Sequence, residues 1–253
     1  MTTAAVPAGR EFLIFAIAFG ATLLGSMSGG SSSLLTTPVW LSLGVPLPTA
    51  VGTDKIAGTF WTVVGSRNYL ARRPVEWRLL IGMALLGVAG ALAGAAVTTS
   101  VDPGRLRRVV GGLILVAVAA VARRPHLGVT ETKPRLPRAL VAAAALPLGF
   151  YEGLLGSGNS IVTSLLFTTG LGFDLIRALG HYYAMAAVWC GVAAASYLAR
   201  GWFDAAIAVP ATLGAVAGGF LGSRLGRRAG SRVVRIIFLV AGTVLGLKLL
   251  AGW

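Results

Sequence analysis

The stretch GSMSGGSSS at residues 25–33 returns as GLLGSGNS at residues 153–160, 128 positions later. The same offset places YLAR at 69–72 on YLAR at 197–200 without a gap. Internal duplication in an apolar chain is typical of membrane transporters, whose binding site lies where the two repeats meet. We call the stretches 25–33 and 153–160 the two breaks; they are the first places to look for a binding site.

The composition excludes a water-soluble globule, because 56% of the residues are hydrophobic and only 12% are charged. We expect an all-α polytopic membrane protein, one integral membrane domain made of two inverted repeats, residues 1–128 and 129–253. Each repeat would hold about four spanning helices and a short broken or re-entrant helix, giving about 8–10 membrane segments. The short pieces fall near 33–44 and 160–171, and the spans near 11–27, 48–70, 77–98, 105–122, 138–155, 176–199, 203–224 and 232–251.

The net charge of +14 does not indicate a nucleic-acid partner, because the basic residues lie in short loops between the expected spans. With an odd number of crossings per repeat, 15 Lys and Arg residues share one face and 6 share the other. The richer face is cytoplasmic by the positive-inside rule, which places both termini in the periplasm. The first apolar stretch is interpreted as a retained helix rather than a signal peptide. The lone Cys190 offers no disulfide framework and no metal cluster.

The two breaks are the first candidate site. Glycines let the backbone leave helical geometry, and a new short helix exposes N–H groups and a positive dipole end that suit an anion. Ser32 or Ser33, and Asn159 or Ser160, are natural caps for those helices. Tight packing by small residues is the alternative. The substrate-binding candidates in the breaks are Ser28, Gly29, Gly30, Ser31, Ser32, Ser33, Gly156, Ser157, Gly158, Asn159 and Ser160.

A second matched signature follows each break, AVGTDK at 50–55 and ALGHYY at 178–183. Charge near the start of a span normally faces an interior or a cavity, so Lys55 is a candidate for binding an anion, together with His181 and Tyr182. Asp54, Glu152 and His181 are the candidates for proton coupling. Each of these residues also has a structural interpretation, which stays open. Asp54 and Lys55 would extend to the membrane interface or pair with loop residues. His181 would be a hydrogen-bonded packing residue, and Glu152 would bond backbone N–H groups at the second break.

Polar side chains also recur along the helix expected at 48–70. Lys55, Thr59, Thr62, Ser66 and Tyr69 are spaced by four and three residues and form one polar stripe. A lipid-facing helix would not carry a continuous polar stripe, so this helix is expected to line a pathway. The adjacent stripe holds Asp54, Gly58, Trp61, Gly65 and Asn68, and the mate helix is plainer, with Tyr183, Ala187, Cys190, Ala194 and Tyr197.

With the breaks and the Ala-x-Gly-Thr signature in view, the chain resembles the sulfite exporter TauE/SafE family of bacterial membrane proteins. The first copy carries Gly29-Gly30, Pro38, LGVP at 43–46 and AVGT at 50–53. The second copy carries Gly149-Phe150, GLLGSG at 153–158 and ALG at 178–180. The resemblance implies a multi-pass permease of the bacterial inner membrane for small organosulfur anions such as sulfite, sulfoacetate or other sulfonates. Departures from the family pattern, Ser31–Ser33, Asn159 and His181, add hydrogen-bonding groups.

The leading hypothesis is thus a secondary transporter that works by alternating access around a site between the repeats. Its partners would be a small anion and the lipid bilayer, with no cofactor, no metal, no nucleic acid and no catalytic residue. A homodimer is an option that the sequence leaves open. The alternative is an intramembrane enzyme acting on a lipid phosphate, which would need a nucleophile with a base or clustered carboxylates.

Overall fold

A computed structural model describes residues 8–28, 32–98, 100, 103–123 and 126–251, and within these ranges the ordered elements are helical. The first half contains α1 (Ala8–Ser28), α2 (Ser33–Ser42), α3 (Leu47–Leu70), α4 (Trp77–Val97) and α5 (Pro103–Ala122). The second half contains α6 (Arg138–Ala143), α7 (Ala145–Leu154), α8 (Asn159–Leu166), the π-helical turn η1 (Phe167–Leu171), α9 (Leu175–Ala199) and α10 (Ala205–Leu250).

Three described helices, α4, α9 and α10, are long and apolar enough to cross a membrane, and α1 contains a shorter apolar stretch, Glu11–Met27. At 46 residues, α10 would be about 70 Å long if straight, roughly twice the hydrocarbon thickness of a bilayer. It bends at Gly230, whose φ of 83° lies outside helical geometry. The stretches expected as separate spans at 203–224 and 232–251 thus lie on either side of one kink.

The stretch expected as one span at 138–155 is divided at Ala144 into α6 and α7. Pro147 explains this division, because it has no N–H to donate and its ring clashes with the preceding turn inside a helix. The break places Pro147 in the first turn of α7, where a missing N–H is tolerated.

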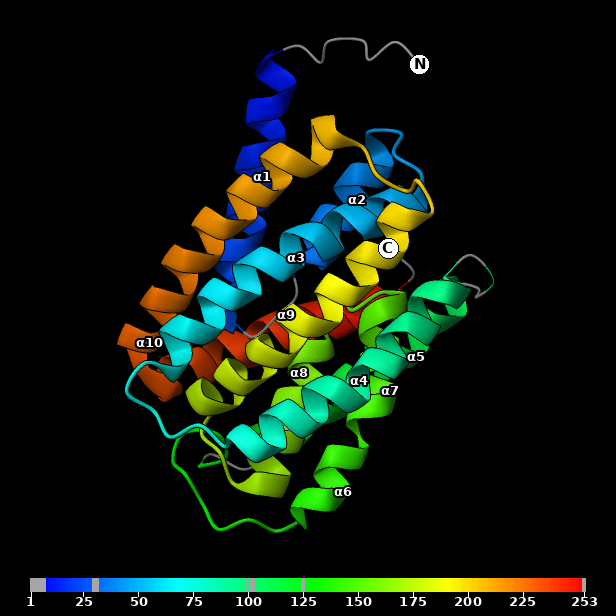
Figure 1. The fold of residues 1–253 in the computed structure, drawn as a ribbon. Helices are drawn as coiled ribbons and strands as arrows, with labels where there is room; N and C mark the ends of the chain where they lie inside the picture. Colours follow the sequence, from blue (N-terminus) through cyan, green and yellow to red (C-terminus); the bar gives the residue numbers. More distant parts are fainter. Residues whose placement is uncertain (1–7, 29–31, 99, 101–102, 124–125, 252–253) are drawn as a thin grey trace.

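The helix packing follows the 128-residue offset, and the pairs lie side by side in Figure 1. In one pair, α1 lies against the first part of α10; in the matched pair, α7 lies against α4. Gly94 on α4 faces the backbone of Phe150, and its counterpart Gly222 on α10 faces the backbone of Leu23. A Cβ at either glycine would overlap that backbone. Small residues therefore permit close helix approach at equivalent places in both halves.

The core is centred on α9, which packs against both α3 and α4 (Figure 1). Trp61 and Tyr183 meet edge to face, with ring centroids 4.9 Å apart. Tyr69 is fully buried, and its hydroxyl donates to the carbonyl oxygen of Ser26 at 2.7 Å. These aromatic contacts join α1, α3 and α9 directly beside the breaks.

Each short helix follows a helix end. In the second half, α7 ends at Leu154, and Gly156 and Gly158 adopt φ values of 77° and 82° before α8 begins. Only glycine takes this left-handed conformation without strain. In the first half, α1 ends at Ser28 and α2 begins at Ser33; Gly29, Gly30 and Ser31 lie outside the described residues.

The expected side-chain caps are not formed in the described parts of the breaks. Ser32 at the N-cap of α2 makes no capping hydrogen bond, and the N-cap position of α8 is Gly158, which has no side chain to cap with. Asn159 is already within α8, and its amide instead donates to the Leu148 carbonyl at 3.0 Å and to Glu152. The prediction of capping by Ser32 or Asn159 was therefore wrong.

Candidate functional site

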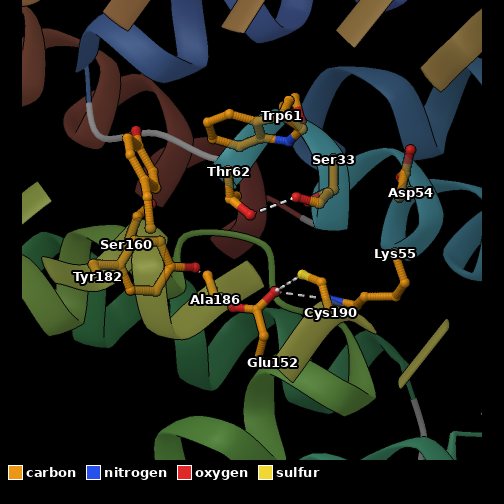
Figure 2. A pocket seen from close by; sticks show the side chains of 13 residues that line it. Ser33, Asp54, Lys55, Trp61, Thr62, Glu152, Ser160, Tyr182, Ala186 and Cys190 are labelled. Atoms are coloured by element: carbon orange, nitrogen blue, oxygen red, sulfur yellow. Dashed lines mark hydrogen bonds and ion pairs between the residues drawn. The ribbon is translucent and has the colours of Figure 1, made fainter. Parts of the chain in front are cut away.

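A small cavity of about 30 Å³ lies between the first and second halves of the chain, with room for one or two water molecules (Figure 2). It is bounded by the start of α2, the middle of α3, the end of α7, the start of α8 and one face of α9. The described residues that line it are Ser32, Ser33, Asp54, Lys55, Gly58, Trp61, Thr62, Glu152, Ser160, Tyr182, Tyr183, Ala186 and Cys190.

A buried ion pair joins the two halves of the chain across this cavity. The Lys55 ammonium on α3 lies 2.8 Å from Glu152 Oε1 on α7, and the two side chains are 4% and 5% exposed. Figure 2 shows the two groups pointing toward each other from facing elements. A Cβ at Gly156 would overlap both Lys55 Nζ and Glu152 Oε1, so the glycine in the second break makes room for the pair. Glu152 is the one described hydrogen-bond partner of Lys55 Nζ.

Glu152 is held by three further groups. The Tyr182 hydroxyl donates to Oε2 at 2.7 Å, the Asn159 amide donates to the same oxygen at 2.8 Å, and the Cys190 thiol lies 3.4 Å from Oε1. A buried carboxylate needs such donors to offset its lost hydration. Glu152 therefore bonds side chains of α3, α8 and α9, not the backbone N–H groups that the sequence left as an alternative.

The two breaks touch each other directly. The hydroxyl oxygens of Ser33 and Ser157 are 3.0 Å apart, and Tyr151 donates to the carbonyl oxygen of Ser157 at 2.5 Å. Gly158 lies away from this contact, because a Cβ there would meet side chains of Ile114 and Leu245. The start of α2 and the second break thus meet through one pair of hydroxyls.

Asp54 lines the cavity but is bound mainly to α2. Thr36, Thr37 and Trp40 donate hydrogen bonds to its two carboxylate oxygens at 2.8, 2.5 and 3.0 Å. Adjacent helical positions do not face one another, which is why Asp54 and Lys55 have different partners. Asp54 fixes the short helix α2 against α3, directly after the first break.

His181 is not among the residues that line the cavity. Its Nδ1 lies 2.8 Å from the Arg177 carbonyl oxygen, and its Nε2 accepts from the N–H of Glu76 at 3.1 Å. Because Nε2 accepts, Nδ1 carries the proton, so the contacts assign a neutral imidazole. The ring packs 5.0 Å from Phe173. This geometry corresponds to the packing role that the sequence left open for His181.

The polar stripe of α3 reaches the cavity only in part. Lys55 and Thr62 line it, while Tyr69 bonds Ser26 farther along the helix. Sequence reasoning missed Cys190 and Tyr183 as lining residues. The 128-residue offset contains the signal for Cys190, because it superposes this residue on Thr62. Of the remaining candidates, Ser28 ends α1, and Gly29, Gly30 and Ser31 fall outside the described part of the chain.

Comparison with known proteins identifies the family to which this architecture belongs. A family model described as Sulfite exporter TauE/SafE matches residues 14–249. The chain is 31% identical over 170 residues to "Probable membrane transporter protein ORF9" of Sinorhizobium sp, covering 66% of this chain and 64% of that relative. It is 31% identical over 178 residues to a "Probable membrane transporter protein" of Haemophilus influenzae, covering 68% of each. It is 27% identical over 175 residues to "Probable membrane transporter protein YfcA" of Escherichia coli strain K12, covering 67% of this chain and 63% of the relative.

These relatives are named as membrane transporters, and none of the three names supports the alternative of a lipid-phosphate enzyme. The chain spans slightly less than two thirds of the length of two of them. The family match itself covers nearly all of the described helices. The chain belongs to the sulfite exporter TauE/SafE family.

Proposed function

We propose that this protein is a secondary transporter that moves small organosulfur anions, such as sulfite, sulfoacetate or other sulfonates, through the cavity between its two repeats. One observation carries the proposal: a buried ammonium from the first repeat is paired with a carboxylate from the second at the place where the two breaks meet. Ionisable groups buried inside a membrane domain mark substrate or ion pathways.

The chemistry of the lining favours an oxyanion. Lys55 is the cation among the described lining residues, and Thr62, Ser160 and Tyr182 add hydroxyl groups around it. Hydroxyl and ammonium donors suit sulfonate and sulfite oxygens. In the present conformation the cavity has room for only one or two water molecules, so an anion requires the surrounding helices to move. That requirement supports alternating access, in which one repeat moves against the other around a fixed site.

We further propose that the repeats are inverted, with 8–10 membrane segments in a bacterial inner membrane and both termini in the periplasm. The matched pairs α1 with α10 and α4 with α7 support a two-fold relation between the halves. The 15-to-6 distribution of basic residues supports the orientation.

Flux measurements on the purified chain in proteoliposomes test the proposal. We expect uptake or efflux of sulfite, sulfoacetate or taurine that is lost when Lys55 is replaced by Ala, because the cavity then has no cation. Lys133→Ala is the matched control, since Lys133 is exposed in the loop before α6. Flux of none of the three probes, or Lys55→Ala flux equal to that of Lys133→Ala, would contradict the proposal.

Asp54, Glu152 and His181 were the candidates for proton coupling, and they differ in what they contact. Asp54 is bound to α2, and His181 bonds backbone groups outside the cavity. Only Glu152 contacts the cation that the substrate would use. We therefore propose Glu152 as the coupling group.

A further inference from the structure

We propose that an anion and a proton enter this site together: the anion takes the place of Glu152 at the Lys55 ammonium, and Glu152 takes up one proton as it leaves. Each monovalent anion would then move with one proton. The inference rests on the proposed function and states how proton binding is coupled to anion binding at the same site. The O–H bond on Glu152 is the one bond that forms, and the bond that breaks is an O–H bond of a hydronium ion, which leaves as water on the side that the site faces.

The first argument is electrostatic. Lys55 and Glu152 neutralise one another in the empty site, and both are nearly inaccessible to water. A second anion at Lys55 would leave one negative charge without a partner in a region of low dielectric, which is strongly unfavourable. Protonation of Glu152 removes that charge, so the occupied site stays neutral.

The second argument comes from hydrogen-bond accounting around Glu152. Asn159 is fully buried, and its Oδ1 accepts no hydrogen bond from any described residue although its Nδ2 donates to Glu152. A buried amide oxygen without a donor is unfavourable unless it is used in another state. A protonated Glu152 supplies the missing donor when the Asn159 amide rotates and turns Oδ1 toward the new O–H, and this rotation gives up the hydrogen bond from Nδ2 to the Leu148 carbonyl. Asn159 can thus pair with Glu152 as a carboxylate or as a carboxylic acid.

None of the described groups that contact Glu152 is a second carboxylate. The titratable groups that contact it are Lys55 from α3 and Tyr182 and Cys190 from α9, and α8 contributes only the Asn159 amide. The basic residues at the starts of α4 and α6, Arg78 and Arg138, are exposed, whereas Glu152 is buried. The other lining carboxylate, Asp54, already accepts three hydrogen bonds from α2.

The experiment measures proton uptake when anions bind to the purified full-length chain in weakly buffered detergent solution. The probes are isethionate and methanesulfonate, whose sulfonates stay ionised near neutral pH, so any proton taken up belongs to the protein. We expect about one proton per bound anion and, by linkage, a Kd that rises about tenfold per pH unit once Glu152 is ionised. Glu152→Gln mimics the protonated acid, so it should bind the probes with no proton uptake and a flat pH profile. Glu11→Gln, at an exposed position of α1, should behave like the unmodified chain.

The outcomes are distinguishable. Anion binding to the unmodified chain without proton uptake and with a pH-independent Kd would overturn this inference while leaving the transporter proposal intact. The same uptake in Glu152→Gln would overturn it as well. Failure of the unmodified chain to bind any sulfonate or sulfite would overturn the proposed function, and the inference with it. If Glu152→Gln does not fold, the pH dependence of the Kd for the unmodified chain still tests whether a proton binds together with the anion.

Discussion

Breaking the buried pair from either side should destabilise the protein, and removing both partners should not. Removing one partner of a buried ion pair typically lowers the free energy of unfolding by about 3–5 kcal/mol. The loss in Lys55→Met should lie at the lower end of this range, because Tyr182 and Asn159 still donate hydrogen bonds to the unpaired Glu152 carboxylate. Glu152→Gln lies at the upper end, because Glu152 is the one described partner of the ammonium. The double variant should lie within about 1 kcal/mol of the unmodified chain.

This double-mutant cycle is measured by thermal denaturation, in one detergent, of the unmodified chain, the two single variants and the double variant. A loss of about 3 kcal/mol corresponds to a shift of roughly 6–12 °C in the midpoint for a chain of this size. We expect shifts of that order in each single variant and recovery in the double variant, which gives a coupling energy of several kcal/mol. Single variants that melt within about 2 °C of the unmodified chain, or a double variant whose loss is the sum of the two, would refute the buried pairing.

Three further perturbations test the packing around the site. Gly94→Ala should lose about 1–3 kcal/mol of stability through overlap with α7, whereas Gly82→Ala, with open space around its Cβ, should lose none; equal melting midpoints would contradict the close approach. Asp54→Asn should speed hydrogen exchange across 33–42 about 10- to 100-fold, because α2 loses charge-assisted hydrogen bonds; unchanged exchange would show that Asp54 does not hold α2. The hydrogen bond from Arg138 lowers the pKa of Glu76 below its ordinary 4.5, so this stabilisation is present above pH 4.5 and is lost as the pH falls through the lowered value. Glu76→Gln should therefore melt below the unmodified chain at neutral pH and together with it in acid; a gap that persists in acid would argue against the ion pair.

The short helices of the fold were predictable because glycine and proline act locally. The offset between residues 25–33 and 153–160 predicted two short helices after the breaks, and α2 and α8 begin there. The two spans expected at 203–224 and 232–251 correspond to the parts of α10 on either side of Gly230. The division of 138–155 at Ala144 was not predicted, because it depends on how a helix with one proline is accommodated by its neighbours, which composition does not reveal.

The site was predictable in its residues but not in its pairing. Helical spacing placed Lys55 on a polar face, and the second break drew attention to Glu152. Nothing in either pattern joins two side chains 97 positions apart, because periodicity says which face of a helix is polar and not which helix it meets. For the same reason, the sequence did not predict that residues of α2 donate hydrogen bonds to Asp54 or that the Asn159 amide donates to Glu152.

Cross-linking the two breaks tests most directly whether they form one moving site. The hydroxyls of Ser33 and Ser157 are 3.0 Å apart, so cysteines at both positions are within reach of a disulfide. In proteoliposomes, with the free Cys190 of the cavity replaced by Ala throughout, mild oxidation of Ser33→Cys/Ser157→Cys should form an intramolecular disulfide and stop sulfite or sulfoacetate flux, and reduction should restore the flux. Neither single variant should respond to oxidation. Absence of a cross-link, or full flux through the cross-linked protein, would contradict a transport site between the repeats.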